Sequence, residues 1–424
     1  MRAISFVLLG LFPVMAFAGF ENPDSNLLNG FSRIFEGEKN FSISMLKQVR
    51  RHQPNGNLFF SPFSTYNALL LAYFGSSGVT EKQLYNGLNL KWSSSKEAVR
   101  SAYRMEKVQS SIRWRQSPLT LSSANRIFVD ESVKVQSNFQ NRLYDEIKKM
   151  DFRYQPEKAL REINDWIANK TYNQIQDMLN SDEINDRTLM ILANAAYLKG
   201  DWISQFDEQR TSQKPFYMSS RAQEPVPMMQ QKGTFKINYN EELQVQFLDM
   251  PYRTVFKSQE TPFSTPGEQS DVSMLLLLPT SSDVSLNTVI SKLDPGTLEK
   301  LIETAMAREV ELSMPKFEFE QRMELTPILG NMGITNLFTN SATFEDLTSQ
   351  RISIDEAQHL AKIKVDEKGS TAAAATILFV SRSARPADPS QFNCDHPFLF
   401  LIYDHKVKSI LFTGVYSDPK SMKY

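Results

Sequence analysis

The sequence predicts an α+β protein, and two patterns along the chain support this class. In the first third, apolar residues recur every three or four positions, which is the spacing of one buried helix face. In the rest of the chain, short segments either alternate apolar and polar residues or are apolar throughout, which is typical of strands. Helices followed by strands with interspersed helices indicate large mixed sheets. The helical spacing is seen at Leu27, Leu28, Phe31, Ile34 and Phe35.

Further helices are expected before residue 115. The segment 57–62 is typical of a short buried strand that leads into a helix, with Pro62 in the first turn, where a missing N–H is tolerated. Thr80-Glu81-Lys82-Gln83 has the form of a capping box and predicts a helix start. Residues 95–112 predict another helix, with basic side chains on one face.

Later segments predict strands. Residues 189–198 are almost continuously apolar, as in a strand buried on both sheet faces. Residues 309–314 and 361–366 alternate, which is typical of half-buried strands. Residues 398–403 and 410–415 are joined by a short polar stretch and predict a hairpin.

The composition is that of a chain with a sizeable core. Its 424 residues are 41% hydrophobic and 22% charged, which excludes intrinsic disorder and small disulfide-stapled scaffolds. The 47 Lys and Arg against 48 Asp and Glu give a net charge of −1, whereas a dedicated nucleic-acid binder usually shows a basic excess. No repeat or linker-like stretch divides the chain. We therefore expect one folded unit that does not bind nucleic acid.

The N-terminus has the features of a secretory signal peptide. Arg2 precedes an apolar run over 4–14, and Ala16-Phe17-Ala18 fits the small–x–small cleavage pattern. The run is shorter than the roughly 20 residues of a membrane-spanning helix. We therefore expect a signal peptide over 1–18, and a single secreted domain over 19–424 with no membrane anchor.

In a secreted chain, the number of cysteines and the presence of sequons can be interpreted. Cys394 is the only cysteine, so no internal disulfide can form, and a buried apolar role is expected rather than a nucleophilic one. The sequons at Asn40 and Asn169 are candidate glycosylation sites.

One segment does not fit a packed core. Residues 369–376 are small, and the apolar residues 377–380 follow. As a strand, the segment would direct its small alternate residues to one face, so it could enter a packed sheet without clashes. Gly369 would give the backbone freedom of a hinge. An alanine-rich loop or helix of no special function is the alternative. The small inward residues would be Ser370, Ala372, Ala374 and Thr376.

A set of motifs lies in a characteristic order along the chain. They are Asn57–Ser64, Asn194–Trp202, Leu312–Phe317, Met332–Ile334, His359–Thr376, Asp395–Phe400 and Leu411–Gly414. In this order they resemble the serpin family over nearly the whole mature length. Within the second motif, Leu198-Lys199-Gly200-Asp201-Trp202 is similar to the family's Phe-Lys-Gly-x-Trp.

The resemblance implies a serpin fold with a helical N-terminal half, three β-sheets including a large central sheet A, and an exposed reactive loop over about 368–390. It implies an irreversible, suicide-type inhibitor of extracellular serine proteases rather than an enzyme. A protease attacks the loop, an acyl-enzyme forms, and the freed limb inserts into the central sheet. The expected protein is a monomer that forms a covalent complex with its protease and needs no cofactor or metal. The alternative is a non-inhibitory serpin acting as a carrier or storage protein. The small inward hinge residues favour the inhibitor.

The resemblance also assigns two groups of supporting residues. One is a polar gate beneath the central sheet, formed by Ser61, Ser64, Asn194 and His359. The other is the place where insertion begins, formed by Trp202, Lys316 and the hinge residue Glu367, where an ion pair would hold the sheet closed.

The attacked bond has two candidates. Counting fourteen residues from Gly369, as in typical inhibitory members, gives Ser383–Ala384 and an elastase-like target. A loop shorter by one residue gives Arg382–Ser383 and a trypsin-like target, because the aspartate of a trypsin-like pocket pairs with Arg. We favour Arg382–Ser383. Arg385 is a third option but falls two residues late.

Other groups of residues give only weak evidence for a catalytic, metal or ligand site. The four His show no metal-ligand spacing, and Asp395-His396 beside a proline is more typical of a structural pair than of a catalytic triad. A hydrolase is therefore the least favoured reading. The basic stripe Lys96, Arg100, Arg104 and Lys107 could bind a heparin-like polyanion or could be an ordinary solvated face.

Overall fold

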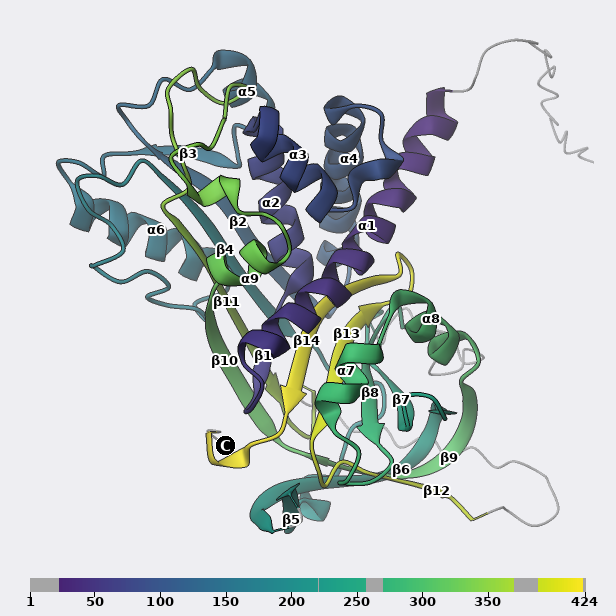
Figure 1. Ribbon diagram of the computed structural model, residues 1–424. Coiled ribbons are helices and arrows are strands. Elements are labelled where there is room, and N and C mark those ends of the chain that lie inside the picture. Colours follow the sequence, from purple (N-terminus) through teal and green to yellow (C-terminus); the bar gives the residue numbers. More distant parts are fainter. Residues whose placement is uncertain (1–22, 220, 257–269, 370–387, 422–424) are drawn as a thin grey trace, which may run out of the picture.

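The computed structural model describes residues 23–219, 221–256, 270–369 and 388–421. Its α-helices are α1 (Pro23–His52), α2 (Pro62–Gly75), α3 (Gly78–Gly87), α4 (Lys96–Arg115), α5 (Ser137–Arg142), α6 (Pro156–Lys170), α7 (Leu286–Lys292), α8 (Pro295–Glu303) and α9 (Thr326–Asn331). The helices α1 to α4 pack together in the upper part of the view, and α1 runs down to β1 in the middle of the molecule (Figure 1).

The strands of the described residues form two hydrogen-bonded networks. They are β1 (Leu58–Phe60), β2 (Thr120–Asp130), β3 (Ile147–Met150), β4 (Met190–Lys199), β5 (Ser212–Ser219), β6 (Ala222–Asn240), β7 (Val245–Pro251), β8 (Val272–Pro279), β9 (Met306–Pro315), β10 (Phe317–Glu324), β11 (Glu356–Val365), β12 (Ser390–Asn393), β13 (Phe398–Asp404) and β14 (Ser409–Tyr416). A five-stranded sheet has the order β10-β11-β4-β2-β3. A nine-stranded network has the order β1-β14-β13-β8-β7-β6-β9-β12, with β5 paired to β6.

The α+β class is confirmed, with one difference in how the sheets connect. Three sheets were expected. The 19-residue strand β6 pairs with β5 and β9 in one part and with β7 in the other. Because β6 is continuous, its hydrogen bonds join two of the expected sheets into one network. The five-stranded sheet corresponds to the expected central sheet.

The predicted elements are present, and one helix start was wrong. The strand before Pro62, the apolar strand β4 and the β13–β14 hairpin all form where they were expected. Helix α3 begins at Gly78, two residues before the proposed capping box. The Thr80 hydroxyl donates instead to Asn336 Oδ1 at 2.5 Å, so it serves a long-range contact rather than a helix cap.

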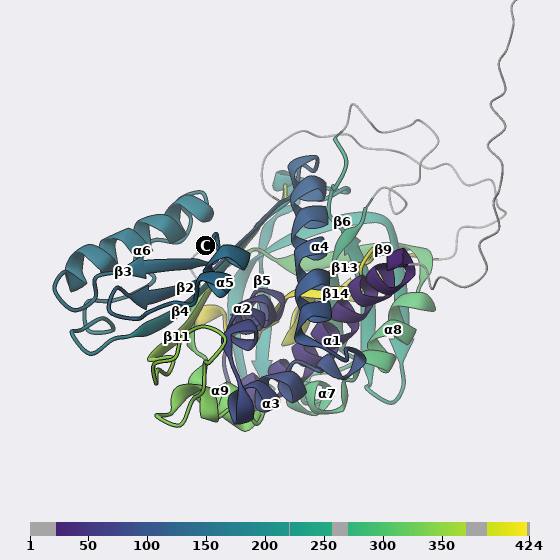
Figure 2. The same cartoon turned by 90° about the horizontal axis from the view of Figure 1, so that it is seen from above.

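Helices cover the central sheet on both faces. Helix α6 lies on the outer face, beside β2 and β3 (Figure 2), where Ile163 and Ile167 pack with Phe128 and Ile191. All 14 residues of α2 are buried, because this helix packs against β2 and β4 on one side and β14 on the other. An all-round apolar surface suits such a helix.

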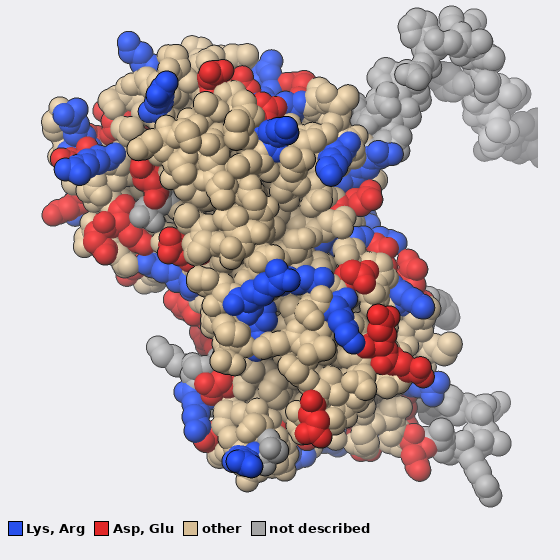
Figure 3. All heavy atoms as spheres, in the orientation of Figure 1, with Lys and Arg blue, Asp and Glu red and all other residues tan. Residues whose placement is uncertain are grey.

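The described residues contain no helix long and apolar enough to cross a membrane. Acidic and basic side chains are interspersed over the face seen in Figure 3, in keeping with the balanced charge. The proposed signal peptide over 1–18 and the loop residues 370–387 lie outside the described residues.

Candidate functional site

The seam between β4 and β11 is the feature of the central sheet that bears on function. The two strands pair in parallel from Ile191 opposite Glu356 to Leu198 opposite Ile363. Over this stretch they hydrogen-bond directly to each other, so no strand lies between them in the described residues. A segment that follows β11 and turns back would run antiparallel to both neighbours, and antiparallel pairing is slightly more stable per residue than parallel pairing.

The gate residues meet in the middle of this seam. His359 on β11 lies opposite Asn194 on β4, and a hydrogen bond joins their side chains. The amide Nδ2 of Asn194 donates to Ser64 Oγ at 2.7 Å. The Ser61 backbone N–H donates to His359 Nε2 at 2.8 Å, and the Ser61 hydroxyl donates to the Leu411 carbonyl at 2.7 Å. All four gate residues are buried, so this cluster connects the seam to the start of α2 and to β14.

The His359 ring is neutral in this environment. Its Nε2 accepts a backbone N–H, so the ring proton sits on Nδ1 and points to Asn194 Oδ1. Burial lowers the pKa of His359 from 6.5 to about 3, and a hydrogen bond to Asn194 opposes this shift. A protonated ring would lose its acceptor for the Ser61 N–H and would place an unpaired charge in the core.

Three further residues complete the gate and were missed from the sequence. Ser64 Oγ lies 2.7 Å from Ser123 Oγ and 3.1 Å from Asn125 Oδ1, both on β2. Thr65 Oγ1 donates to Asn194 Oδ1 at 3.3 Å. A signal was present, because Ser123 and Asn125 are polar residues two apart that share one face of a strand.

A second cluster, which we call the exit cluster, lies where the chain leaves β11. It comprises Trp202, Lys316 and Glu367. Lys316 Nζ lies 2.9 Å from Glu367 Oε2, and the Thr211 hydroxyl donates to Glu367 Oε1 at 2.8 Å. Burial raises the pKa of Glu367, but the hydrogen bonds from Lys316, its own N–H and Thr211 outweigh burial, and the net shift is downward. The carboxylate is thus held ionised.

Trp202 ties its own loop to the turn that follows β11. Its ring is fully buried and stacks on Tyr252 with centroids 4.2 Å apart. The indole Nε1–H donates to the Asp366 carbonyl at 3.0 Å, and the Trp202 backbone N–H donates to the Lys368 carbonyl at 3.2 Å. The sequence-predicted exit residues are therefore brought together from three chain segments, and the segments of Trp202 and Glu367 cross.

Gly369 is required by the geometry of this crossing. Its φ is +87°, a left-handed value that favours glycine. A Cβ at this position would lie 2.4 Å from the Gly200 carbonyl oxygen and 2.5 Å from the Trp202 nitrogen. Any side chain would force two backbones apart. The remaining hinge residues and the candidate bond Arg382–Ser383 lie outside the described residues.

The basic stripe on α4 carries little unpaired charge. Arg100 is buried, and Arg104 donates to the Arg142 carbonyl at 2.9 Å. Carboxylates neutralise the charges of the other three residues of the stripe. The ion pairs are Lys96 with Asp346, Arg100 with Glu97, and Lys107 with Glu146. This geometry argues against a polyanion site, because a ligand would have to displace existing partners.

The two sequons differ in access. Asn40 lies inside α1, is half-buried and donates to the Glu36 carbonyl at 2.8 Å. Asn169 is exposed in the last turn of α6. Of the two, Asn169 offers the more accessible amide in the folded chain.

The remaining candidates are structural. Cys394 is buried, and burial raises the pKa of its thiol well above its usual value, so it is a poor nucleophile. His396 Nε2 bonds the Pro279 carbonyl at 2.8 Å while Nδ1 faces Asp395. Both ring nitrogens are therefore occupied. No group of three His, Cys, Asp or Glu suited to a metal occurs in the part of the chain that the structure describes.

Comparisons with known proteins agree on one family. A family model described as Serpin (serine protease inhibitor) matches residues 36–419. Serine protease inhibitor 88Ea of Drosophila melanogaster is 53% identical over 426 residues, with 100% of both chains covered. Serpin B9 of Homo sapiens is 30% identical over 390 residues, covering 89% of this chain and 97% of that protein.

Solved structures show the same fold. Uncleaved ovalbumin has a TM-score of 0.78 at 24% identity and covers 91% of this chain and 100% of its own. Serpin-12 of Manduca sexta has a TM-score of 0.76 at 24% identity and covers 91% of this chain and 98% of its own. The family match, the relatives and the β4–β11 seam lead to one assignment: the chain belongs to the serpin family of serine protease inhibitors and is not an enzyme.

Proposed function

We propose that this serpin is a secreted, irreversible inhibitor of trypsin-like serine proteases. The observation that carries the proposal is the closed parallel seam, whose strand β11 leads within four residues to a glycine hinge. The chain beyond that hinge begins with small alternate residues. Several relatives are named as inhibitors, among them Leukocyte elastase inhibitor of Xenopus laevis.

The chemical step uses the protease's own nucleophile. Its serine oxygen attacks the carbonyl carbon of Arg382, and the bond from that carbon to the Ser383 nitrogen breaks. The new Ser383 amine leaves with a proton supplied by the protease, and an ester to Arg382 remains. Hydrolysis of the ester would release active protease, so inhibition requires that the freed limb insert first.

Insertion would replace the single strand pairing between β4 and β11 by two strand pairings. The freed segment would separate β4 from β11 and pair antiparallel with each, so both strands keep their hydrogen-bond partners and the new strand gains two. Thirteen residues, 370–382, extend to about 40 Å, which exceeds the length of a ten-residue strand. The hydrogen bond between His359 and Asn194 spans the seam and must break, so the gate sets part of the barrier.

The test is to mix the protein with trypsin and with an elastase and to examine the products on denaturing gels. We expect an SDS-resistant complex with trypsin, and N-terminal sequencing of the released peptide should begin at Ser383. Arg382→Ala should lower the rate of trypsin complex formation at least 100-fold. Sequencing from Ala384 would favour the elastase-like alternative.

Two outcomes would overturn the proposed inhibitory function. One is clean loop cleavage with full protease activity, as for a carrier or storage protein. The other is identical melting temperatures of intact and loop-cleaved protein, since insertion must raise the melting temperature. Secretion has its own test: protein recovered from the medium of expressing cells should begin at Gly19.

A further inference from the structure

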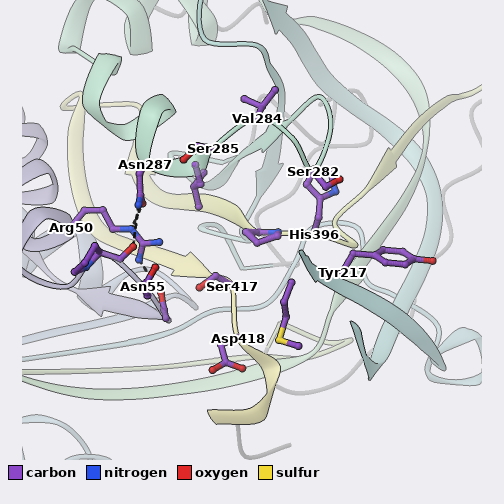
Figure 4. A pocket seen from close by; sticks show the side chains of 15 residues that line it. Arg50, Asn55, Tyr217, Ser282, Val284, Ser285, Asn287, His396, Ser417 and Asp418 are labelled. Carbon is purple, nitrogen blue, oxygen red and sulfur yellow. Dashed lines mark hydrogen bonds between the residues drawn. The ribbon is translucent and has the colours of Figure 1, made fainter. Parts of the chain in front are cut away.

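A cavity distinct from the seam lies where the end of α1, the start of α7 and the C-terminal segment meet. Its volume is about 380 Å³, within the range of small-molecule sites. Figure 4 shows the labelled side chains that surround it: Arg50 and Asn55 on one side, Ser285 and Asn287 at the start of α7 above, and His396 and Tyr217 on the other side. Neither the gate nor the exit cluster contributes to its lining.

Arg50 is the unusual residue of this lining. It is 8% exposed, yet no carboxylate lies within ion-pair distance of it among the described residues. Its Nε donates to Asn287 Oδ1 at 2.5 Å, and its Nη1 donates to the Gly56 carbonyl at 2.9 Å. These partners are neutral. A buried guanidinium without a counter-ion is costly, and an anion from outside would relieve that cost.

The guanidinium keeps donor capacity toward the cavity. A guanidinium has five N–H groups, and both partners above use Nε and Nη1. Nη1 also donates to the Gln53 carbonyl at 3.5 Å, and Nη2 makes no hydrogen bond within the described residues. A ligand oxygen at Nη2 would therefore not have to displace an existing partner.

The rest of the lining is partly apolar. Met218, Val284, Leu286 and Pro397 border the cavity together with the exposed ring of Tyr217. This mixture of one cation with aliphatic and aromatic surface suits a ligand that has an apolar body and an anionic head.

Two further titratable residues, His396 and Asp418, line the cavity. His396 is held by Asp395 and the Pro279 carbonyl, so neither of its ring nitrogens is free for a ligand. The Asp418 carboxylate accepts the Lys420 backbone N–H at 3.0 Å, so it is engaged within the chain.

From these observations we propose that the cavity binds a small organic anion with an apolar body, its carboxylate against Arg50 and its chain along Met218, Val284 and Leu286. This site is independent of protease inhibition.

The probe for the experiment is octanoate, measured by titration calorimetry on the full secreted chain. Octanol and octylammonium are matched probes with the same apolar body. We expect saturable one-to-one binding of octanoate with a Kd of about 1 mM or below, and at least tenfold weaker binding of the other two.

Variants locate the binding. Arg50→Met keeps the aliphatic stem and should weaken octanoate at least tenfold, whereas Arg51→Met, at an exposed neighbour, should leave it unchanged. Ser285 makes no side-chain cap bond, so Ser285→Trp fills the cavity without removing a contact and should abolish binding even if Arg50→Met fails to fold.

Three results would overturn the site: no saturable binding of octanoate, equal binding of octylammonium, or unchanged binding in Ser285→Trp. Protease inhibition serves as the fold control, because each folded variant should form the trypsin complex at the wild-type rate.

Discussion

At the exit cluster, a lysine and a glutamate form an ion pair with one partner partly open to water, whereas at the gate His359 and Asn194 form a neutral contact in the core. The Lys316 side chain is 32% exposed, and His359 and Asn194 are fully buried. Exposed ion pairs contribute little net stability, but a buried polar group left without its partner is costly. If the seam opens as we propose, its exit end should separate at lower cost than its middle, and the substitutions below test this difference.

The largest effect is expected at the gate. Asn194→Ala removes the partner of His359 Nδ1–H and of Ser64, and leaves buried polar atoms unsatisfied. The free energy of unfolding should fall by about 2–4 kcal/mol, and polymer should appear on native gels at temperatures where the wild type stays monomeric. Denaturant titration measures the first quantity. Asn141→Ala, at an exposed asparagine of α5, is the control and should change stability by less than about 0.5 kcal/mol. Equal effects at the two positions would refute the gate.

A smaller effect is expected at the exit cluster. Glu367→Lys replaces attraction to Lys316 by repulsion and should lower stability by about 2 kcal/mol, because Lys316 is partly screened by water. Premature insertion or polymerisation should follow, measured as the rate of polymer growth on mild heating.

Reversing both charges distinguishes the contribution of the ion pair from that of side-chain packing. Adding Lys316→Glu to Glu367→Lys should restore at least half of the lost stability, while failure of the double variant to recover would point to packing instead. Lys368→Ala removes an exposed pair with Glu208 and should leave polymer growth unchanged.

The smallest effect concerns pH. The folded chain holds the pKa of His359 at about 3, below its ordinary 6.5. Between these values the unfolded state binds a proton that the folded state does not, so this residue's contribution to stability is present above pH 6.5 and is lost as the pH falls. From pH 7.5 to 5.5 the loss should be about 1 kcal/mol.

Two buried glutamates act in the opposite direction. Burial raises the pKa of Glu38 and of Glu106 to about 7 from 4.5. Below pH 7 the folded state binds these protons more readily than the unfolded state, which adds stability as the pH falls. The measurement is therefore a difference: unfolding of wild type minus that of His359→Gln at each pH. A difference that does not change with pH would exclude His359 as the titrating group.

The local spacing of apolar and polar residues predicted most of the helices and strands. It failed where a side chain bonds a residue far away in the sequence. The period of the apolar residues gave β4, β11 and the last hairpin, because burial on one or both faces is visible in neighbouring residues. The proposed cap at Thr80 was wrong because its hydroxyl bonds Asn336, more than 250 positions away.

Family resemblance supplied the gate and exit residues, but only in part. Ser123 and Asn125 on β2 and Thr65 on α2 also join the gate. The spacing of Ser123 and Asn125 shows that they share a strand face, but only the tertiary structure shows that this face meets Ser64. The basic stripe on α4 is compensated by carboxylates from other segments. No local pattern shows such partners.

The sequence by itself determined the α+β class, the order of the elements and the small residues after Gly369, since these depend on the spacing of side chains along a few turns or strand residues. Only the tertiary structure decided that Gly369 lies against the backbone of residues 200–202, that His359 is neutral, and that Arg50 is buried with no carboxylate beside it among the described residues. Each of these depends on which distant segments meet, and hydrogen bonding, desolvation and steric contact act only once they have met.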